Sequence, residues 1–256
     1  MQLIDTHAHI YEVEFQDNLS DILENAQKNY VQKIYMPNIN ETTLSKMMAV
    51  AARYPTQCFP MMGIHPCYIK RNFTNQLYLV EEWLNKASFL AIGEIGIDQY
   101  HSSAFLAEQE EAFMIQLNLA KKHQLPVSIH CRNAFKRMLQ LLEKAQDGSL
   151  KGVIHCFTGN TIEAEYCIKL GFRLGIGGLI TLPSHKLAET LTTIAANHLV
   201  LETDSPYLAP LPHRGKRNEP GYLRYTAAKL AAIKQMPLTE IAAITTENAT
   251  RLFNNQ

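Results

Sequence analysis

The feature that most constrains this chain is a series of eight short apolar or β-branched runs, separated by longer stretches of helical period. The runs cover residues 2–5, 31–36, 58–64, 89–95, 126–131, 152–157, 172–176 and 198–203. Between them, segments such as 106–123 repeat apolar residues at spacings of three and four, which is typical of amphipathic helices. The 199 residues from Asp5 to Asp204 divide into seven intervals of about 28, the size of a strand–helix unit.

This alternation predicts an α/β fold, a single (β/α)8 TIM barrel formed by residues 1–256 as one domain. No Pro/Gly/Ser-rich stretch or charge run interrupts it, so a second domain is not indicated. The main competitor, an open doubly wound sheet, would carry a glycine-rich phosphate loop after its first strand, where this chain has His7 and His9. We also expect helices at 19–29 and 42–53, with Asp17 or Asn18 capping the first and Asn40 the second.

Composition excludes some classes of function. The 24 Lys+Arg residues balance 24 Asp+Glu, which argues against a protein whose whole surface binds nucleic acid or anionic membrane. No run of 18 apolar residues and no basic, then apolar, leader is present, so neither a membrane span nor a signal peptide is predicted. The five scattered cysteines, without a C-x-x-C pair, predict reduced thiols and a cytoplasmic location. No obligate protein partner is indicated, and the oligomeric state stays open.

Six residues of metal-ligating type stand at the ends of predicted strands, namely His7, His9, Glu94, His130, His155 and Asp204. Because barrel enzymes build their active sites at the carboxyl ends of the strands, we expect these side chains to meet at the barrel mouth. An isolated H-x-H pair is most often two ordinary polar residues. Four histidines and two carboxylates around one mouth, however, would be costly to bury without a compensating charge, which favours a metal site over a structural polar network.

Ligand type narrows the metal. Nitrogen and carboxylate ligands suit Zn²⁺, Mn²⁺, Fe²⁺, Co²⁺ or Ni²⁺, whereas Mg²⁺ usually takes more oxygen. Six ligands are too many for one tetrahedral ion and suit two divalent metal ions about 3.5–4 Å apart, bridged by a carboxylate and a water or hydroxide. Cys131 and Cys156 directly follow two of the histidines, and strand alternation predicts that both point the other way, into the helix-facing core.

In chain order the motifs read DTHAH at residues 5–9, GIHP at 63–66, IGEIGID at 92–98, HCR at 130–132, HCFTG at 155–159, ETDSPYLAP at 202–210 and HRGKRNEP at 213–220. This series resembles the TatD family of metal-dependent deoxyribonucleases, which are amidohydrolase-type barrels. The resemblance implies one metal at His7, His9, Glu94 and Asp204, and another at Glu94, His130 and His155. The chain departs from the family pattern at Gln99, where an aromatic residue is usual, and at Cys67, where histidine is common. Both departures bear on substrate fit rather than on the metals.

Roles follow from charge and position. Asp204 is expected to act as general base toward a hydroxide bridging the metals, with Glu94 as the bridging catalytic carboxylate. His65, at the end of the third run, is expected to contact a substrate phosphate or support a ligand, narrowly ahead of capping the turn at Pro66. Asp98 shares parity with Glu94 and could orient a ligand or, equally, cap a loop.

Substrate-binding residues are expected beside the metals. Arg214, Lys216 and Arg217 lie in a loop after the last strand, and with Arg132 they are predicted to capture phosphate. Tyr207 and Tyr222 could stack a nucleobase, although plain packing is the commoner role of such residues.

The function that these features predict is a divalent-metal-dependent hydrolase, a deoxyribonuclease that cleaves phosphodiester bonds of DNA in single strands or at strand ends. One alternative is an amidohydrolase-type enzyme acting on a small-molecule ester or amide, but a neutral amide would not need the basic loop. Another is a non-catalytic metal-binding scaffold protein, which would not need Asp204 as a base beside a complete ligand set.

Overall fold

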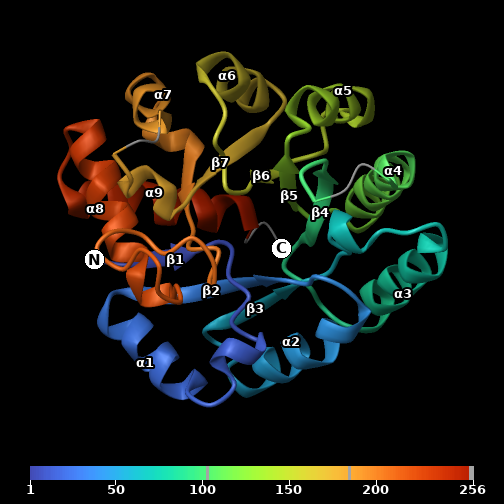
Figure 1. Ribbon diagram of the computed structural model, residues 1–256, viewed down its shortest axis with the longest axis horizontal. Coiled ribbons are helices and arrows are strands. Elements are labelled where there is room, and N and C mark those ends of the chain that lie inside the picture. Colours follow the sequence, from blue (N-terminus) through green and yellow to red (C-terminus); the bar gives the residue numbers. More distant parts are fainter. Residues whose placement is uncertain (102–103, 184–185, 254–256) are drawn as a thin grey trace.

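The computed structural model describes residues 1–101, 104–183 and 186–253. These residues form eight strands, surrounded by helices (Figure 1). The strands are β1 (Leu3–Asp5), β2 (Val31–Pro37), β3 (Cys58–Met61), β4 (Ile92–Asp98), β5 (Val127–Arg132), β6 (Gly152–Ile154), β7 (Phe172–Ile176) and β8 (Leu199–Leu201). All eight predicted strands are therefore present, and every pair is parallel.

The strands form a barrel from two sheets whose edges meet. Strands β1-β2-β3 make one sheet and β4-β5-β6-β7-β8 the other. Isolated parallel bridges join them, Met62 to Ile92 on one side and Ala8 to Ser205 on the other. The amide of Asp204 also donates to the carbonyl of His7 at 2.9 Å. The predicted (β/α)8 barrel is confirmed, with its last contacts made just beyond the strand ends.

The helices occupy the intervals that the sequence pattern assigned to them. They are α1 (Leu19–Lys28), α2 (Glu41–Arg53), α3 (Phe73–Lys86), α4 (Leu106–His123), α5 (Phe135–Ala145), α6 (Thr161–Lys169), α7 (Leu187–Thr193), α8 (Leu223–Lys234) and α9 (Leu238–Phe253). Short 3-10 turns also occur, among them η1 (Val13–Phe15), η2 (Pro66–Tyr68) and η5 (Pro220–Tyr222). Within the described ranges, no helix combines the length and apolar character needed to cross a membrane.

The helix caps partly follow the prediction. Asn40 caps α2 as expected, because its side chain accepts hydrogen bonds from the amides of Thr42 and Thr43. Asn18 stands at the N-cap of α1, but its side chain makes no capping hydrogen bond. Its side-chain oxygen instead accepts a hydrogen bond from Arg217, at 3.3 Å. The side chain predicted to cap α1 is therefore bound by a loop that is distant in the sequence.

Strand boundaries are where the sequence pattern was least accurate. The run 89–95 gives a strand displaced to Ile92–Asp98, and the runs 58–64, 152–157 and 198–203 end earlier than predicted, at Met61, Ile154 and Leu201. Apolar composition continues past these points because the chain stays buried at the mouth, while the ladder hydrogen bonds stop. Burial and strand pairing are separate properties, and the sequence pattern reports mainly burial.

The barrel is closed by apolar packing at the end opposite its mouth. Ile4, Val153 and Val200, the central residues of β1, β6 and β8, pack with Tyr35 of β2 and Phe253 of α9 in a cluster separate from the main helix-facing core. The rings of Tyr35 and Phe253 meet edge to face, with centroids 4.9 Å apart. Helix α9 therefore covers one end of the barrel, which leaves polar side chains to gather at the other.

Candidate metal centre

Glu94 of β4 stands between two pairs of histidines. Its carboxylate is buried, and its Oε2 atom lies 3.2 Å from Nε2 of His7 and 3.4 Å from Nε2 of His9. Its Oε1 atom lies 2.9 Å from Nδ1 of His130 and 2.9 Å from Nε2 of His155. The two oxygens thus face different histidine pairs, the geometry expected of a carboxylate that bridges two cations.

Asp204, just after β8, joins the first pair. Its Oδ1 atom lies 3.6 Å from Nε2 of His9 and 3.8 Å from Nε2 of His7. The facing nitrogens within each pair, His7 with His9 and His130 with His155, are 3.3 Å apart. Ligand atoms at about 2.0–2.1 Å from a tetrahedral ion lie about 3.3 Å from one another, so both spacings fit a cation. We call these six residues, His7, His9, Glu94, His130, His155 and Asp204, the Glu94 cluster.

A local irregularity in β4 aims Glu94 into the mouth. The register with β5 shifts between Ile92 and Ile95, so strict alternation along β4 is broken at this point. The backbone here is closely packed, because a Cβ atom on Gly93 would lie 2.7 Å from the Cβ of Ser128. Glycine at position 93 therefore lets the strand approach β5 closely where it turns Glu94 toward the histidines.

The first two histidines each have their other ring nitrogen engaged by a neighbouring hydroxyl. Nδ1 of His7 lies 3.1 Å from the hydroxyl of Ser128. Nδ1 of His9 lies 2.9 Å from the hydroxyl of Tyr11, which donates its own proton to the carbonyl of Pro37 and so accepts one from His9. In its neutral form, the ring of His9 therefore keeps its proton on Nδ1 and presents an unprotonated Nε2 to the cluster, as a metal ligand does.

The second pair is held by carboxylates. Nε2 of His130 lies 2.9 Å from Oδ2 of Asp98, and Nδ1 of His155 lies 3.5 Å from Oε1 of Glu202. Asp98 also accepts hydrogen bonds on Oδ1 from the amides of Tyr100 and His101, both at 2.8 Å. The carboxylate of Asp98 therefore contacts His130 and caps the loop at once, while its role in orienting a metal ligand stays a prediction.

The electrostatics of the cluster fit a cation. Burial lowers the pKa of His9, but the carboxylates of Asp204 and Glu94 outweigh it and raise that pKa to about 9. Burial also opposes charge on His155, yet Glu94 and Glu202 raise its pKa well above the usual value. For Glu94, burial favours the neutral acid, but the surrounding histidines lower its pKa and keep it ionised. The carboxylates thus demand positive charge at this position, which divalent cations would supply.

His65 lies beside the cluster but with a different tautomer. Its Nδ1 accepts a hydrogen bond from the amide of Cys67, so in the neutral ring Nε2 carries the proton. That Nε2 lies 3.4 Å from Oε1 of Glu94. Burial lowers the pKa of His65 to about 4 despite the charge of Glu94, so the ring is neutral at neutral pH. It presents a donor rather than a lone pair to the mouth.

Comparison with known proteins supplies the family. The family model described as TatD related DNase matches residues 4–254. The chain belongs to the TatD family. A relative from Bacillus subtilis, named uncharacterized metal-dependent hydrolase YabD, is 35% identical, with 98% of each chain covered. The TatD protein of Pectobacterium parmentieri, named a 3'-5' ssDNA/RNA exonuclease, is 32% identical over 98% of this chain and 99% of its own.

A solved TatD structure shares the fold. The crystal structure of the TatD homologue YjjV from Escherichia coli K12 superposes with a TM-score of 0.93 at 28% identity, covering 99% of this chain and 98% of that one. Together with the sequence relatives, it shows that this chain is a metal-dependent hydrolase of the TatD family with a barrel fold.

The four basic residues predicted to bind phosphate in this TatD protein have different surroundings. Arg132 is the last residue of β5, and its guanidinium lies 3.6 Å from the ring centroid of Tyr100. Arg214 and Lys216 are exposed. Arg217 instead donates to the carbonyl of Glu14 and lies over the ring of Phe15, 4.8 Å from its centroid. In the structure Arg217 fastens the loop onto η1, and its role in binding phosphate stays a prediction. The local sequence could not show this because the partner lies about 200 residues away.

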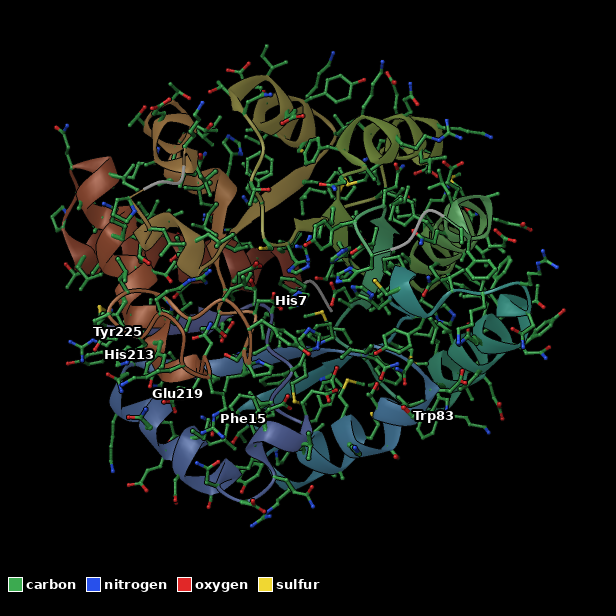
Figure 2. The ribbon with its side chains drawn as sticks, in the orientation of Figure 1. His7, Phe15, Trp83, His213, Glu219 and Tyr225 are labelled. Atoms are coloured by element: carbon green, nitrogen blue, oxygen red, sulfur yellow. The ribbon has the colours of Figure 1, made fainter. Side chains whose placement is uncertain are left out.

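The two candidate stacking tyrosines also separate. Tyr207 is 50% exposed, and its ring lies 6.2 Å from that of His9, beside the Glu94 cluster. Tyr222 is stacked on His213, with centroids 3.9 Å apart, and packs against Tyr225. Figure 2 shows His213 and Tyr225 at the left edge of the molecule while His7 lies at its centre. Tyr222 is therefore a packing residue, and only Tyr207 keeps the predicted position.

The two cysteines next to ligands behave differently. Cys131 packs against the main core, as alternation predicts. Cys156 has a left-handed backbone, φ +46°, because β6 has already ended at Ile154. Burial raises the pKa of the Cys156 thiol, and the charges of Asp204, Glu202 and Glu94 raise it further. The prediction that Cys156 faces the helices is therefore wrong, since alternation holds only along an extended strand.

Sequence reasoning missed three residues that hold the ligands, namely Ser128, Tyr11 and Glu202. Each stands two positions from a predicted ligand, and Ser128 lies with His130 in β5, so strand parity could have found Ser128. Glu202 is fully buried, accepts a hydrogen bond from the amide of Cys156 and lies against Gly175. A Cβ atom on Gly175 would lie 2.2 Å from Oε2 of Glu202, so glycine makes the room that this carboxylate needs.

Proposed function

We propose that this TatD-family hydrolase cleaves phosphodiester bonds of DNA, in single strands or at strand ends, using two divalent cations. The observation that carries the proposal is the position of Glu94, whose two oxygens face separate histidine pairs. Paired cations on a shared carboxylate are a recurrent arrangement in enzymes of phosphoryl transfer. The relative from Pectobacterium parmentieri, named an exonuclease of single-stranded DNA and RNA, supports the same class of substrate.

The donor set divides between the two cations. His7, His9, Glu94 and Asp204 would hold one, and Glu94, His130 and His155 the other. When bound, the cations would supply Lewis acidity toward the phosphoryl oxygen and the attacking water and neutralise charge on the leaving oxygen. Ser128, Tyr11, Asp98 and Glu202 would keep the four imidazoles in the orientation that this requires.

Asp204 would accept the proton of the attacking water. Burial favours its neutral form, but the hydrogen bond from His9 and the charges of His155 and His7 lower its pKa below the usual value. Asp204 is therefore held as a carboxylate, the form that can take up a proton. Its side chain retains some exposure, 14%, so water can reach it.

Groups around the mouth would hold the DNA. The Nε2 proton of His65 and the cations of Arg132, Arg214 and Lys216 would bind phosphate oxygens, and Tyr207 would stack a base. A barrel mouth admits a single strand more readily than a rigid duplex. Because the chain has zero formal net charge, binding would rest on these few local cations and weaken as salt rises.

The test compares 5'-labelled single-stranded DNA, blunt duplex, RNA, and small esters and amides, each with Mg²⁺, Mn²⁺, Co²⁺ or Zn²⁺. We expect metal-dependent cleavage of DNA, strongest on single strands or frayed ends, abolished by chelation and restored by added metal. The ladder of products distinguishes end-directed from internal cleavage. Turnover of only esters or amides, with no dependence on salt, would instead support the small-molecule alternative, and metal binding without any turnover would support the scaffold.

A further inference from the structure

A second group of metal-ligating side chains lies next to the Glu94 cluster. It consists of Cys67 in η2, Asp98 at the end of β4 and His101, three residues further on. Sγ of Cys67 lies 3.5 Å from Nδ1 of His101, and the same Nδ1 lies 2.9 Å from Oδ2 of Asp98. One ligand atom from each residue lies within 4.8 Å of the others. A sulfur and a nitrogen bound to one tetrahedral Zn²⁺ lie about 3.5 Å apart, which matches the observed pair.

The contacts of His101 indicate coordination rather than a proton relay. In a Cys–His–Asp relay the thiol and the carboxylate contact opposite nitrogens of the ring, so that a proton can pass across it. Here both groups contact Nδ1. Three donor atoms that converge on one point, instead of lining up across an imidazole, are the arrangement that a cation requires.

The three residues combine a fixed carboxylate with two accessible ligands. Asp98 is fully buried and held by His130 and two backbone amides, so its orientation is set before any ion binds. The side chain of His101 is 53% exposed, and Cys67 is exposed. An ion could therefore enter from solvent, and with only three protein ligands it would keep an open position for water or a substrate oxygen.

We propose that Cys67, Asp98 and His101 bind a further divalent cation of the zinc class, separate from the cations of the Glu94 cluster. Thiolate and imidazole ligands favour Zn²⁺ or Co²⁺ over Mg²⁺. On binding, the sulfur–cation bond forms and the thiol proton leaves to solvent. Because Asp98 also holds His130, the ion would sit next to the proposed catalytic centre and add positive charge where a phosphate approaches.

The test uses zinc content and the absorption spectrum of the cobalt-loaded full chain. A thiolate bound to Co²⁺ gives an intense near-ultraviolet charge-transfer band that nitrogen and oxygen ligands do not give. We expect this band in the wild type and one more zinc equivalent than in Cys67→Ser or His101→Ala, both of which lose the band. Cys131→Ser is the matched control and should keep both. Cys67→His should keep the zinc equivalent but lose the band, which separates loss of a ligand from loss of folding.

A further variant separates this proposal from the proposed function. His7→Ala combined with His155→Ala removes a ligand from each proposed cation of the Glu94 cluster and leaves Cys67, Asp98 and His101 unchanged. The charge-transfer band should persist in this variant whether or not the protein proves to be a nuclease. Absence of the band from cobalt-saturated wild type, or a band that survives Cys67→Ser in a protein of native circular dichroism, would overturn the proposal.

Discussion

Glu94 and Asp204 differ in what they can contribute, although both carboxylates lie beside His7 and His9. Both oxygens of Glu94 face imidazole nitrogens, so this carboxylate connects the two halves of the site and leaves neither oxygen free for another partner. Asp204 approaches the first pair through Oδ1 alone, at 3.6 and 3.8 Å, and remains partly exposed. At the scale of single residues, Asp204 is therefore the carboxylate available to take a proton.

Asp204→Asn tests this assignment. The amide keeps the size and one oxygen donor of the carboxylate but cannot accept the proton, so we expect kcat to fall at least about 100-fold while KM stays within a few fold. The measurement is single-turnover cleavage at equal metal occupancy. Asp147→Asn, in an exposed loop, is the matched control and should leave kcat and KM unchanged. A near-normal rate would show that Asp204 is only a ligand, and His65 would become the next candidate base.

At the scale of elements, the ends of different strands would supply ligands to the two proposed cations. His7 and His9 follow β1, whereas His130 lies in β5 and His155 follows β6, with Glu94 of β4 between them. The loop after β8 carries Asp204 into the same mouth. No single element contains a complete donor set, so the centre depends on the barrel bringing the strand ends together.

This division predicts selective loss of metal. His7→Ala should empty mainly the site that includes Asp204, and His130→Ala mainly the site that includes His155. In each variant Glu94 can still bind the other cation together with that cation's own ligands. Metal content of the purified variants, measured after equilibration with a limiting concentration of Zn²⁺, gives the result. His198→Ala, outside the cluster, is the control. Equal and complete loss in both variants would mean that the two halves bind metal only as a unit.

In the loop between β8 and α8, we expect different residues to contribute to substrate binding and to stability. Replacing Arg214 and Lys216 by alanine should raise KM for oligonucleotides and flatten its salt dependence, without lowering the midpoint of thermal unfolding. Arg217→Ala should instead lower the stability of the fold by about 1–2 kcal/mol, because it removes a hydrogen bond to the Glu14 carbonyl and a cation–π contact with Phe15. An unchanged KM in the double variant would return Arg214 and Lys216 to ordinary surface residues.

At the scale of the whole molecule, the barrel separates stability from chemistry. Its closed end is apolar, with the ring of Phe253 seated on Tyr35 among strand residues such as Val153. Its open end holds buried charged and polar groups, among them His7, His9 and Glu94. The free energy that keeps the mouth in place therefore comes largely from packing at the other end and under the helices.

Phe253→Ala tests this separation. Truncating a ring that is 2% exposed should lower the free energy of unfolding by about 3–5 kcal/mol, the usual cost of such a cavity. Metal content and kcat at a temperature well below the unfolding midpoint should stay near those of the wild type. Denaturant unfolding together with single-turnover cleavage measures both. A parallel fall in metal content would show that the mouth depends directly on the packing of α9.

The sequence by itself determined the barrel and the membership of its polar mouth. Eight strands at regular spacing leave few other parallel architectures, and His7 and Glu94 were marked by their type and their position at strand ends. These features are local, because hydrophobic period and residue chemistry can be read in a short window. The single-domain organisation, the cytoplasmic location and the role of each ligand stay predictions, since the fold does not test them.

Only the tertiary structure decided which groups face one another. The shift in β4 aims Glu94, the early end of β6 turns Cys156 away from the helix-facing core, and Arg217 bonds to Glu14 across the chain. The convergence of Cys67 and Asp98 on one nitrogen of His101 is equally invisible in the sequence. The physical reason is common to all four: strand periodicity predicts direction only while the chain stays extended, and loop contacts depend on distant partners that local pattern does not specify.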